Sequence, residues 1–323
     1  MRRFTYIFLA LLVTALLAAC NSSDSGSESS VNDGTDDTMD AGGGRGGTQN
    51  GFLTLSITDA PIDSAKEVWV QFYGVELKPT ATEDVVTLHF NPALNINLLA
   101  LQGQDSFQMF SNATLPAGEY DWIRLNVNAT NDGILDSYIK LDDNSVHELD
   151  IPSGSESGLK IIGGLEVIAN TPRHMTIDFD LRKSIVMTGA ELFKLKPALK
   201  LVDDSAVSSI SGTVQISALI DSSCPDNDPS TGNAVYLYND LNTTPDDVDN
   251  IAPEPVASAL LTLNNLTGIY EYDFGFIPLG KYTAAFTCQA NLDDPEVDDV
   301  IIFSRGANIN LVNTNKVIAK TFR

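Results

Sequence analysis

The stretch that decides the fold reads Pro116-Ala117-Gly118-Glu119-Tyr120, followed by DWIRLNV at residues 121–127. Pro fixes φ, Gly supplies the unusual dihedrals of a tight turn, and the following residues alternate apolar and polar as a half-buried strand requires. A shorter version, Pro278-Leu279-Gly280-Lys281-Tyr282, opens a second apolar strand. The turn and the ring repeat, whereas the charged residues differ. We therefore interpret both copies as architectural corners whose Tyr packs against its own core and donates to the backbone.

Many short strand-like segments surround these two corners. Between residues 51 and 202 no long stretch has helical apolar periodicity, and turn residues separate the apolar runs. Short strands joined by turns indicate a sandwich or a barrel, and the length of the chain suggests two domains. The likeliest boundary is the polar break around Asp203-Asp204-Ser205. We predict an all-β protein with two antiparallel β-sandwiches, Ig-like or transthyretin-like, at residues 51–203 and 208–323.

Several local features follow from turn chemistry. Residues 137–141 and 146–151 flank a polar turn and predict a β-hairpin. Gly163-Gly164 lies inside a strand-like region and predicts a bulge. Residues 94–101 are apolar at mixed spacing, which fits either a short helical turn or an extended crossing segment. Asp59, two residues before a proline, is interpreted as an Asx-turn former rather than a functional carboxylate.

The N-terminal residues have the pattern of a bacterial lipoprotein signal. Met1-Arg2-Arg3 precedes an apolar run at residues 4–17, and the run ends in Leu17-Ala18-Ala19-Cys20. That run is short for a membrane span, which needs about 20 apolar residues. We predict a signal peptide at residues 1–19, an acylated Cys20, and a disordered acidic Gly/Ser linker at residues 20–50. The alternative is an ordinary cleaved signal with an incidental cysteine.

The resemblance to lipoproteins also implies a location in the cell envelope. In enterobacterial lipoproteins an Asp after the acylated Cys favours the inner membrane, and this chain has Asn21. The outer membrane is therefore expected rather than the inner one. The 43 acidic and 19 basic residues give a formal charge of −24, which argues against nucleic acid or anionic lipid headgroups as general partners. The same charge suits cations or basic partners.

Two cysteines remain once Cys20 is acylated. Cys224 and Cys288 both lie in the second predicted domain of an exported chain, and an even pair in an oxidising compartment is most simply a disulfide. Such a bond would stabilise that domain by roughly 4 kcal/mol in the chain-entropy model. The alternative is a pair of free thiols with a catalytic or metal role.

No catalytic constellation is evident in the sequence. The three histidines, His89, His147 and His174, do not form a His-Glu-x-x-His pattern. A Gly-x-Ser-x-Gly elbow, a Walker loop and a dinucleotide fingerprint are also absent. We therefore expect no enzyme and name no catalytic residue. A hydrolase or metal site assembled in space from the histidines and neighbouring carboxylates remains the alternative.

Calcium is the one cofactor with a positive sequence signal. Asp226, Asp228 and Ser230 place oxygen side chains at alternating positions, as calcium loops do. The stretch departs from the EF-hand pattern, because Pro229 interrupts it and Leu237 stands where a bidentate Glu is expected. The acidic loops at residues 246–249 and 293–299 could also contribute. Solvated loops are the preferred interpretation, and a calcium-dependent adhesion module is an alternative.

Two parts of the chain resemble known families. Residues 51–203 resemble the bacterial lipoprotein family DUF4382, a domain of unknown function that implies no activity. The second domain is similar to the carboxypeptidase regulatory-like, transthyretin-type sandwich, whose members are generally non-catalytic accessory modules. The first resemblance is carried by LSITDAP at residues 55–61, LPAGEY at 115–120, IRL at 123–125, IDFD at 177–180 and LKP at 195–197; the second is carried by SGTV at 211–214, AVYL at 234–237 and FIPLGKY at 276–282.

These observations predict a lipid-anchored envelope module that binds a protein or glycan partner without catalysing a reaction. The anchor, the all-β composition and the missing catalytic constellation motivate this hypothesis. The alternatives are the envelope hydrolase and the calcium-dependent adhesion module.

Overall fold

A computed structural model describes residues 49–60, 62, 65–151, 158–189, 192–221, 224, 228–314 and 318–323. Residues 46–323 form one compact unit. The predicted signal peptide, Cys20 and nearly all of the predicted linker lie outside the described residues. Within the described part of the chain, no helix has the length and apolar character needed to cross a membrane.

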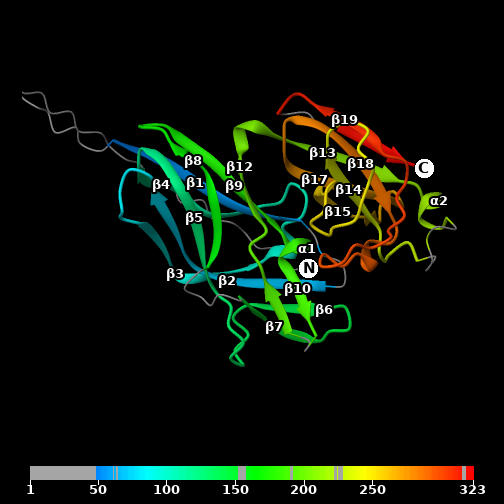
Figure 1. The fold of residues 1–323 in the computed structure, drawn as a ribbon, viewed down its shortest axis with the longest axis horizontal. Coiled ribbons are helices and arrows are strands. Elements are labelled where there is room, and N and C mark those ends of the chain that lie inside the picture. The colour runs from blue at the N-terminus through cyan, green and yellow to red at the C-terminus, as the bar shows by residue number, and fades with distance from the viewer. Residues whose placement is uncertain are drawn as a thin grey trace, which may run out of the picture. The chain divides into compact units, whose positions relative to one another are not determined.

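Two sheets make up the N-terminal half, residues 49–203 (Figure 1). The first sheet has the strand order β12 (Leu199–Asp203), β9 (Pro172–Asp180), β1 (Asn50–Ala60), β4 (Phe107–Pro116). The second sheet has the order β10 (Ile185–Thr188), β11 (Leu192–Leu195), β7 (Val146–Asp150), β6 (Tyr138–Leu141), β2 (Ala65–Pro79), β5 (Gly118–Asn128), β8 (Leu159–Val167), and β3 (Val86–Asn97) also pairs with β2. Short helical turns η1 (Leu98–Ala100) and α1 (Leu181–Ser184) interrupt the strands.

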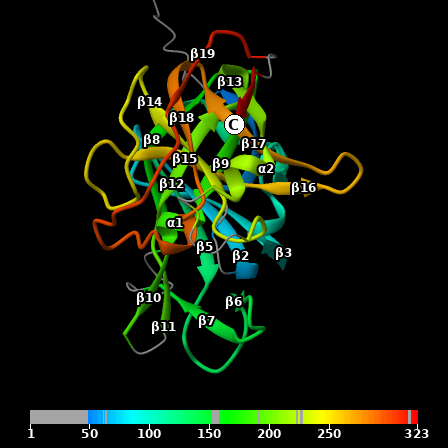
Figure 2. The same ribbon diagram turned by 90° about the vertical axis from the view of Figure 1, so that its right-hand side faces the viewer.

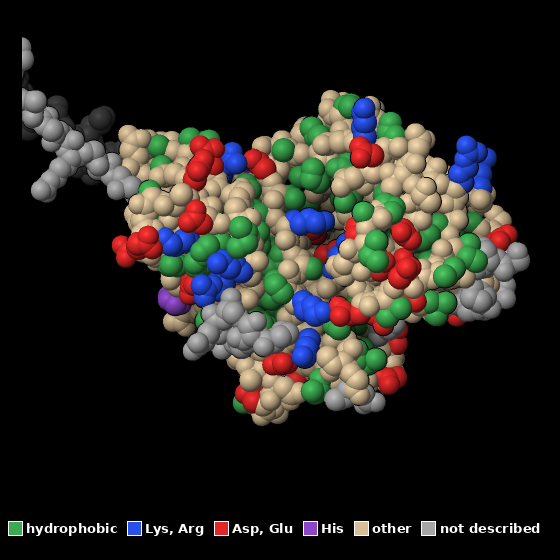
Figure 3. All heavy atoms as spheres, viewed as in Figure 1, with side chains coloured by type: hydrophobic (Ala, Val, Ile, Leu, Met, Phe, Trp, Pro, Cys, Tyr) green, Lys and Arg blue, Asp and Glu red, His purple; other side chains and the backbone are tan. Residues whose placement is uncertain are grey.

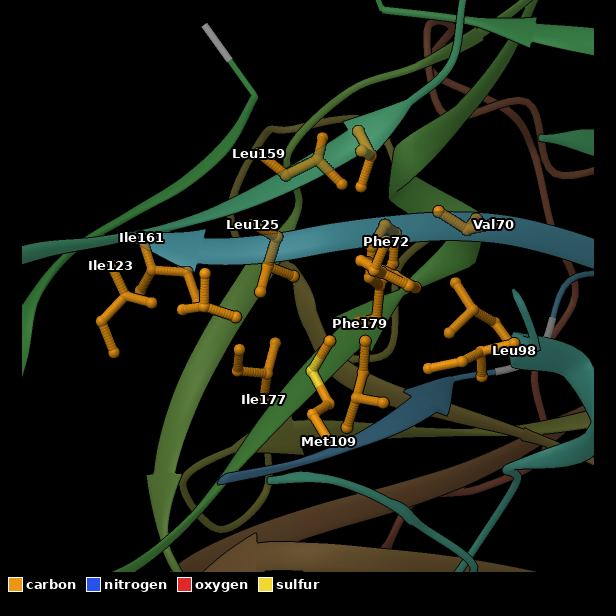
Figure 4. Close-up of a cluster of buried hydrophobic side chains, with 14 of the residues drawn as sticks. Val70, Phe72, Leu98, Met109, Ile123, Leu125, Leu159, Ile161, Ile177 and Phe179 are labelled. Atoms are coloured by element: carbon orange, nitrogen blue, oxygen red, sulfur yellow. The ribbon is translucent and has the colours of Figure 1, made fainter. Parts of the chain in front are cut away.

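The core of this half lies between the two sheets, because alternate side chains of each strand point inward. In Figure 4, Phe72 and Leu125 of the second sheet point toward Ile177, Phe179 and Met109 of the first. Phe72, Leu125, Ile177 and Phe179 are fully buried. The alternation predicted for these strands is therefore what separates the core from the surface.

Two further sheets make up the C-terminal half, residues 207–323. The third sheet has the order β16 (Thr262–Asn264), β17 (Ile269–Pro278), β13 (Val207–Val214), β20 (Ile318–Phe322). The fourth has the order β15 (Pro255–Leu260), β14 (Ala234–Asn239), β18 (Gly280–Thr287), β19 (Ala307–Leu311). The short helices of this half are α2 (Ile216–Leu219) and η3 (Ala290–Leu292). The prediction of two all-β sandwiches is confirmed.

Strand β14 is buried on both faces. Val235 and Leu237 point into the core between the third and fourth sheets. The alternate residues Tyr236 and Tyr238 pack in a second cluster with Val248 and Ala290, on the other face of the fourth sheet. A strand with two buried faces explains why AVYLY at residues 234–238 is apolar throughout. Segments that follow β14 and β18 must cover its outer face.

The sheets are not purely antiparallel. Strand β1 pairs in parallel with β9, β7 with β11, and β13 with β20. The two predicted sandwiches are rich in antiparallel pairs, and these three parallel pairs are a feature that the prediction did not include. Each joins strands far apart in the chain, and such long-range pairings leave no local turn signal.

Both Pro-Gly-Tyr corners have the predicted role. The Tyr120 hydroxyl donates to the Pro116 carbonyl at 2.8 Å, and the Tyr282 hydroxyl donates to the Pro278 carbonyl at 2.7 Å. Tyr120 is 3% exposed and Tyr282 is 5% exposed. Each ring packs in the core of its own half. The repeated motif is therefore a structural corner, as predicted.

The other local predictions have mixed outcomes. Strands β6 and β7 form the expected hairpin, and Gly163 and Gly164 form the expected bulge, with φ of 71° and 88°. Residues 94–101 combine both expected forms, since β3 runs to Asn97 and η1 follows. Asp59 lies near the end of β1, opposite Phe179 of β9. Its role as an Asx-turn former stays a prediction, because residues 61, 63 and 64 lie outside the described residues.

Only η2 (Asp204–Ala206) connects the two halves in sequence, between β12 and β13. In Figure 1 the strands up to β12 lie mainly at the left, and β13 to β19 lie at the right. Figure 2 shows the hairpins β6–β7 and β10–β11 close together at its lower end, consistent with the pairing of β7 and β11. The predicted domain boundaries at residues 203 and 208 stay a prediction.

Candidate functional site

The three histidines lie on separate strands. His89 is on β3 and His147 is on β7, both in the second sheet, whereas His174 is on β9 in the first. The His147 ring packs on Phe193 with 4.9 Å between ring centroids, and its Nε2 is 3.1 Å from the Ser145 hydroxyl. Where the structure is described, the clusters of three or more possible metal ligands contain only aspartates. The histidines are therefore not brought together with each other.

A cleft of about 570 Å³ lies where the two halves meet. The N-terminal half contributes the end of β1, the turn at residues 102–104 and part of β9, and the C-terminal half contributes β13, β15 and β17. Four carboxylates line it, and none of its described lining residues is basic. These carboxylates belong to Asp59, Asp178, Glu271 and Asp273.

A side-chain hydrogen bond and a close backbone approach join the two walls of this cleft. The Gln104 side-chain amide donates to Asp273 Oδ2 at 3.0 Å. A Cβ on Gly275 would lie 1.9 Å from the Gly103 carbonyl oxygen, so a side chain there would push the walls apart. Asp273 Oδ1 is buried and has no hydrogen-bond partner among the described residues. The contact between Gly103 and Gly275 therefore fixes the spacing of the two walls, and Asp273 Oδ1 could accept a hydrogen bond from a ligand.

The Asp178 carboxyl group in the cleft has a raised pKa. Burial raises its pKa from 3.8 to about 6, and the neighbouring Asp180 adds to the rise. Lys200, its cross-strand neighbour on β12, opposes the rise. Asp178 therefore changes its charge in a pH range where ordinary aspartates stay ionised.

Asp59 belongs to this cleft as well. Its side chain is 4% exposed, and its backbone N–H donates to the Leu101 carbonyl at 3.1 Å. The same sequence position that suggested a turn thus carries a buried carboxylate at the edge of a potential binding site. The neighbouring Thr58 hydroxyl contacts the carbonyls of Leu101 and Asp105, which holds the turn at residues 102–104 against β1.

A second acidic region forms where two loops of the C-terminal half meet. One loop, residues 240–254, joins β14 to β15, and the other, residues 293–306, follows η3. The Tyr236 hydroxyl donates to Asp293 Oδ2, and the Tyr238 hydroxyl donates to the Asp246 carbonyl. The two tyrosines of β14 that point away from the sandwich core therefore fix both loops.

The loops bring five aspartates together. The carboxylates of Asp247, Asp249 and Asp298 offer ligand oxygens within 4.8 Å of one another. Those of Asp247, Asp293 and Asp299 do the same. Asp247 belongs to both groups, is 1% exposed, and accepts from the Asp299 N–H through Oδ2 at 2.5 Å. We call these five residues the aspartate cluster.

Among the described ion pairs, one basic side chain approaches this cluster. Arg182 of α1 is 4% exposed and places Nη1 4.0 Å from Asp293 Oδ2. The same Nη1 donates to the Ala290 carbonyl at 3.0 Å, which docks the N-terminal half onto η3. Burial raises the pKa of Asp293 to about 6, although the Tyr236 hydrogen bond and Arg182 oppose the rise. Burial also raises the pKa of Asp247, and Asp249 and Asp246 add to it.

The residues predicted as weak calcium ligands lie elsewhere. Asp226 is outside the described residues. Asp228 Oδ1 accepts from the Ser230 N–H at 2.9 Å and from its hydroxyl at 2.6 Å, an Asx-turn arrangement. Neither Asp228 nor Ser230 belongs to the aspartate cluster. The loops that were only a secondary suggestion are therefore the ones that converge.

The predicted disulfide is confirmed. Cys224 and Cys288 are bonded, with 5.4 Å between their Cα atoms. Cys288 comes just before η3, so the bond anchors the segment that leads into the second acidic loop. Both cysteines are buried in the core of the C-terminal half.

Sequence reasoning missed Asp178, Asp273 and Arg182 as residues of interest. A signal for Asp178 was available, because alternation in β9 places it on the face opposite Ile177 and Phe179. Its partners across the cleft come from β17, about a hundred residues later in the chain. No local pattern connects the two segments.

Residues 50–197 match the model of the family described as Domain of unknown function (DUF4382). This match confirms the family resemblance of the N-terminal half. The resemblance of the C-terminal half to carboxypeptidase regulatory-like sandwiches stays a prediction. A comparison with curated proteins finds no match.

Solved structures similar to this chain include pilins of bacteria. The chain is similar to the Bacillus anthracis TIE protein, with 13% identity, a TM-score of 0.19 and coverage of 84% of this chain but 33% of that one. It is similar to a variant of BcpA, the major pilin subunit of Bacillus cereus, with 10% identity, a TM-score of 0.19 and coverage of 84% and 70%. The major pilin from Streptococcus pyogenes has 10% identity, a TM-score of 0.17 and coverage of 85% and 98%. The chain spans about a third of the TIE protein chain that it matches.

Proposed function

We propose that this protein is a non-enzymatic, lipid-anchored module of the cell envelope whose acidic cleft binds a basic segment of a protein partner. One observation carries the proposal: four carboxylates line a single cleft of about 570 Å³ whose described lining has no basic residue. A cleft of this size falls within the range of ligand sites in proteins. Its charge selects for a cationic group.

Charge favours a basic partner over other ligands. Clefts that are lined by one sign of charge concentrate oppositely charged groups and repel like ones. Phosphate-bearing or carboxylate-bearing ligands would meet four negative groups, and they are disfavoured for that reason. On the face seen in Figure 3, acidic and basic side chains are interspersed. The cleft is thus a local concentration of negative charge rather than a sample of that surface.

A lysine or arginine side chain fits this lining better than a sugar does. The aromatic residues of the lining, Tyr272 and Phe274, are 2% and 3% exposed and pack in the core of the C-terminal half. Their faces are therefore little available for stacking on a sugar ring. Asp273 Oδ1, in contrast, is a buried acceptor without a described partner, and an ammonium or guanidinium donor would satisfy it.

The hydrolase alternative needs an imidazole beside a carboxylate in one cleft. The histidines lie on β3, β7 and β9, and the described lining of the acidic cleft contains none of them. His147 and Glu148 do line a second, smaller hollow of about 330 Å³, but neighbouring residues of a strand point to opposite faces. These positions favour binding over hydrolysis.

Calorimetric titration with short peptides tests the proposal. We expect an oligolysine peptide to bind at low salt and an oligoglutamate peptide not to bind. The double variant D178N/E271Q should bind oligolysine about fivefold more weakly or worse. Because the pKa of Asp178 is about 6, binding should strengthen between about pH 5 and about pH 7 as the carboxylate ionises. Lys200, Asp180 and the other three carboxylates surround this group and set the size of the effect.

The matched control removes two carboxylates far from the cleft. Glu83 and Asp84 are exposed and lie in the turn between β2 and β3, so E83Q/D84N should keep the affinity for oligolysine. Equal weakening by both double variants would show that net charge alone attracts the peptide, and the cleft would lose its role. Binding of a neutral oligosaccharide that D178N/E271Q abolishes would replace the protein partner with a glycan.

The anchor is a separate part of the proposal. We expect labelled fatty acid to enter the wild-type protein and not Cys20→Ser, which should be released from the membrane fraction. When inner and outer membranes are separated, the wild-type protein should be recovered in the outer-membrane fraction. Label in the Cys20→Ser variant would contradict acylation at this residue.

A further inference from the structure

We propose that the aspartate cluster of Asp247, Asp249, Asp293, Asp298 and Asp299 is a binding site for one divalent cation, with calcium as the preferred ion. The site is separate from the acidic cleft and does not depend on its function. It joins the loop between β14 and β15 to the loop after η3.

The spacing of the carboxylates suits one ion. Calcium takes six to eight oxygen ligands at about 2.4 Å, so oxygens on opposite sides of the ion are about 4.8 Å apart. In each group of three aspartates, the ligand oxygens all lie within 4.8 Å of one another. Asp247 is shared by the two groups and is therefore placed to be the central ligand.

A buried oxygen of Asp247 supplies the independent evidence. The side chain is 1% exposed, and Oδ1 has no hydrogen-bond partner among the described residues, whereas Oδ2 accepts from the Asp299 N–H. Buried carboxylate oxygens are normally paired, because an unpaired one loses its hydration without compensation. A cation held by Asp247 and its neighbours would satisfy this oxygen.

The charges around the aspartate cluster also favour a bound cation. Arg182 approaches Asp293 at 4.0 Å, and no described ion pair with a basic residue involves Asp247, Asp249, Asp298 or Asp299. Lys183 lies near the first loop but pairs with Glu254 at 2.5 Å. Carboxylates at such short separations repel one another unless a cation lies between them.

The surroundings explain why calcium is preferred and how it enters. Several loop carboxylates with flexible spacing match the variable geometry of calcium better than the strict octahedron of magnesium. Backbone N–H groups already hold some of the carboxylates, as Ile251 does for Asp249 at 2.7 Å and Asp294 for Asp299 at 2.8 Å. Asp298 is exposed and provides the approach from solvent.

Thermal unfolding and terbium luminescence test the site on chelator-treated full-length protein. Calcium modules outside the cell bind with a Kd on the order of 10⁻⁴–10⁻³ M, so about 5 mM CaCl₂ should raise the Tm by about 2–6 °C. Tyr236 and Tyr238 contact the two loops. They should therefore sensitise bound Tb³⁺, and Ca²⁺ should displace it.

The Asp247→Asn variant removes the central charge while its amide oxygen can still accept from Asp299. It should fold in chelator at least as stably as the wild type, lose the calcium shift, and weaken terbium binding at least tenfold. The control Asp228→Asn changes an exposed aspartate in another loop of the same half and should keep both responses.

Three results would overturn the site: no calcium shift with no displaceable terbium signal, responses that are unchanged in Asp247→Asn, or equal shifts with Mg²⁺ and Ca²⁺ at the same concentration. None of these results bears on the acidic cleft, whose test uses peptides and different residues.

Discussion

Asp178 shows how burial gives one residue a property that its type does not have. In the sequence it is an ordinary aspartate in the run IDFD at residues 177–180. In the fold it is half-buried on β9, opposite Lys200 of β12 and in the lining of the cleft, and desolvation raises its pKa to about 6. The carboxylate is then well suited to receive a cation but costly while none is bound.

This cost predicts a specific pH dependence of stability. The pKa in the folded state lies above its unfolded value, so the folded state holds the proton more tightly. The Asp178 carboxyl therefore does not lower the free energy of unfolding below about pH 4. Its destabilising effect grows as the pH rises through about 6. If the whole displacement from 3.8 to about 6 is realised, the cost at pH 7 is at most about 3 kcal/mol.

We expect Asp178→Asn to unfold at higher denaturant concentration than the wild type at pH 7 and at nearly the same concentration at pH 4. Urea unfolding at the two values measures this. An advantage of equal size at both would show that the amide stabilises the fold for a reason other than charge.

At the scale of elements, the two Pro-Gly-Tyr corners perform the same task in different sheets. One connects β4 to β5 and the other connects β17 to β18. Gly118 has a φ of 140°, which favours glycine. In each corner the Tyr hydroxyl, four residues after the Pro, donates to the Pro carbonyl. A single intramolecular hydrogen bond of this kind typically contributes about 1 kcal/mol to stability.

Replacing either tyrosine by Phe removes the hydrogen bond and keeps the ring. We expect Y120F and Y282F each to lower the free energy of unfolding by about 1 kcal/mol, with a Tm lower by about 2–4 °C. Tyr73 is 37% exposed, and Y73F is the matched control that should change little. Wild-type stability in both corner variants would contradict the role assigned to the hydroxyls.

At the scale of the whole molecule, the halves are held together by a few specific contacts. Arg182 donates to the Ala290 carbonyl, and Gln104 donates to Asp273. Lys196 pairs with Glu296 at 2.6 Å on the surface. The backbone approach of Gly103 to Gly275 leaves no room for a side chain at residue 275.

We expect Gly275→Ala to lower the free energy of unfolding by about 1–3 kcal/mol, because the added methyl must displace the Gly103 carbonyl. A Cβ on Gly189 would meet no described atom within 4 Å, so Gly189→Ala should change stability by less than about 0.5 kcal/mol. Differential scanning calorimetry of both variants makes the comparison. Equal stability of the two would show that the backbone yields at this contact without cost.

Features that depend on short-range interactions were predictable from the sequence, and most features that depend on long-range contacts were not. The hairpin, the bulge and both corners were predictable, because each depends on residues that are adjacent or four apart. The disulfide was predictable because only Cys224 and Cys288 remained to pair. The position of Asp59 in the cleft was not predicted, because its burial depends on the distant β9 and on the turn at residues 102–104.

The aspartate cluster was predictable from the sequence only in part. Both loops were visible in the sequence as acidic segments, but their meeting depends on Tyr236 and Tyr238, which project from the outer face of β14. The sequence favoured the alternation at residues 226–230 instead, because periodic oxygen side chains are visible without any knowledge of the fold.

By itself, the sequence determined the all-β class, the corner geometry, the cysteine pair and the match of residues 50–197 to a family model. These properties depend on side-chain periodicity and on turn residues, which act over a few positions. Only the tertiary structure decided that β1, β7 and β13 pair in parallel with distant strands, that four carboxylates share one cleft, and that five aspartates converge. Those outcomes require segments far apart in the chain to meet, and the physical reason they meet is the burial of the apolar faces of paired sheets against each other and of the outer face of β14 under the loops.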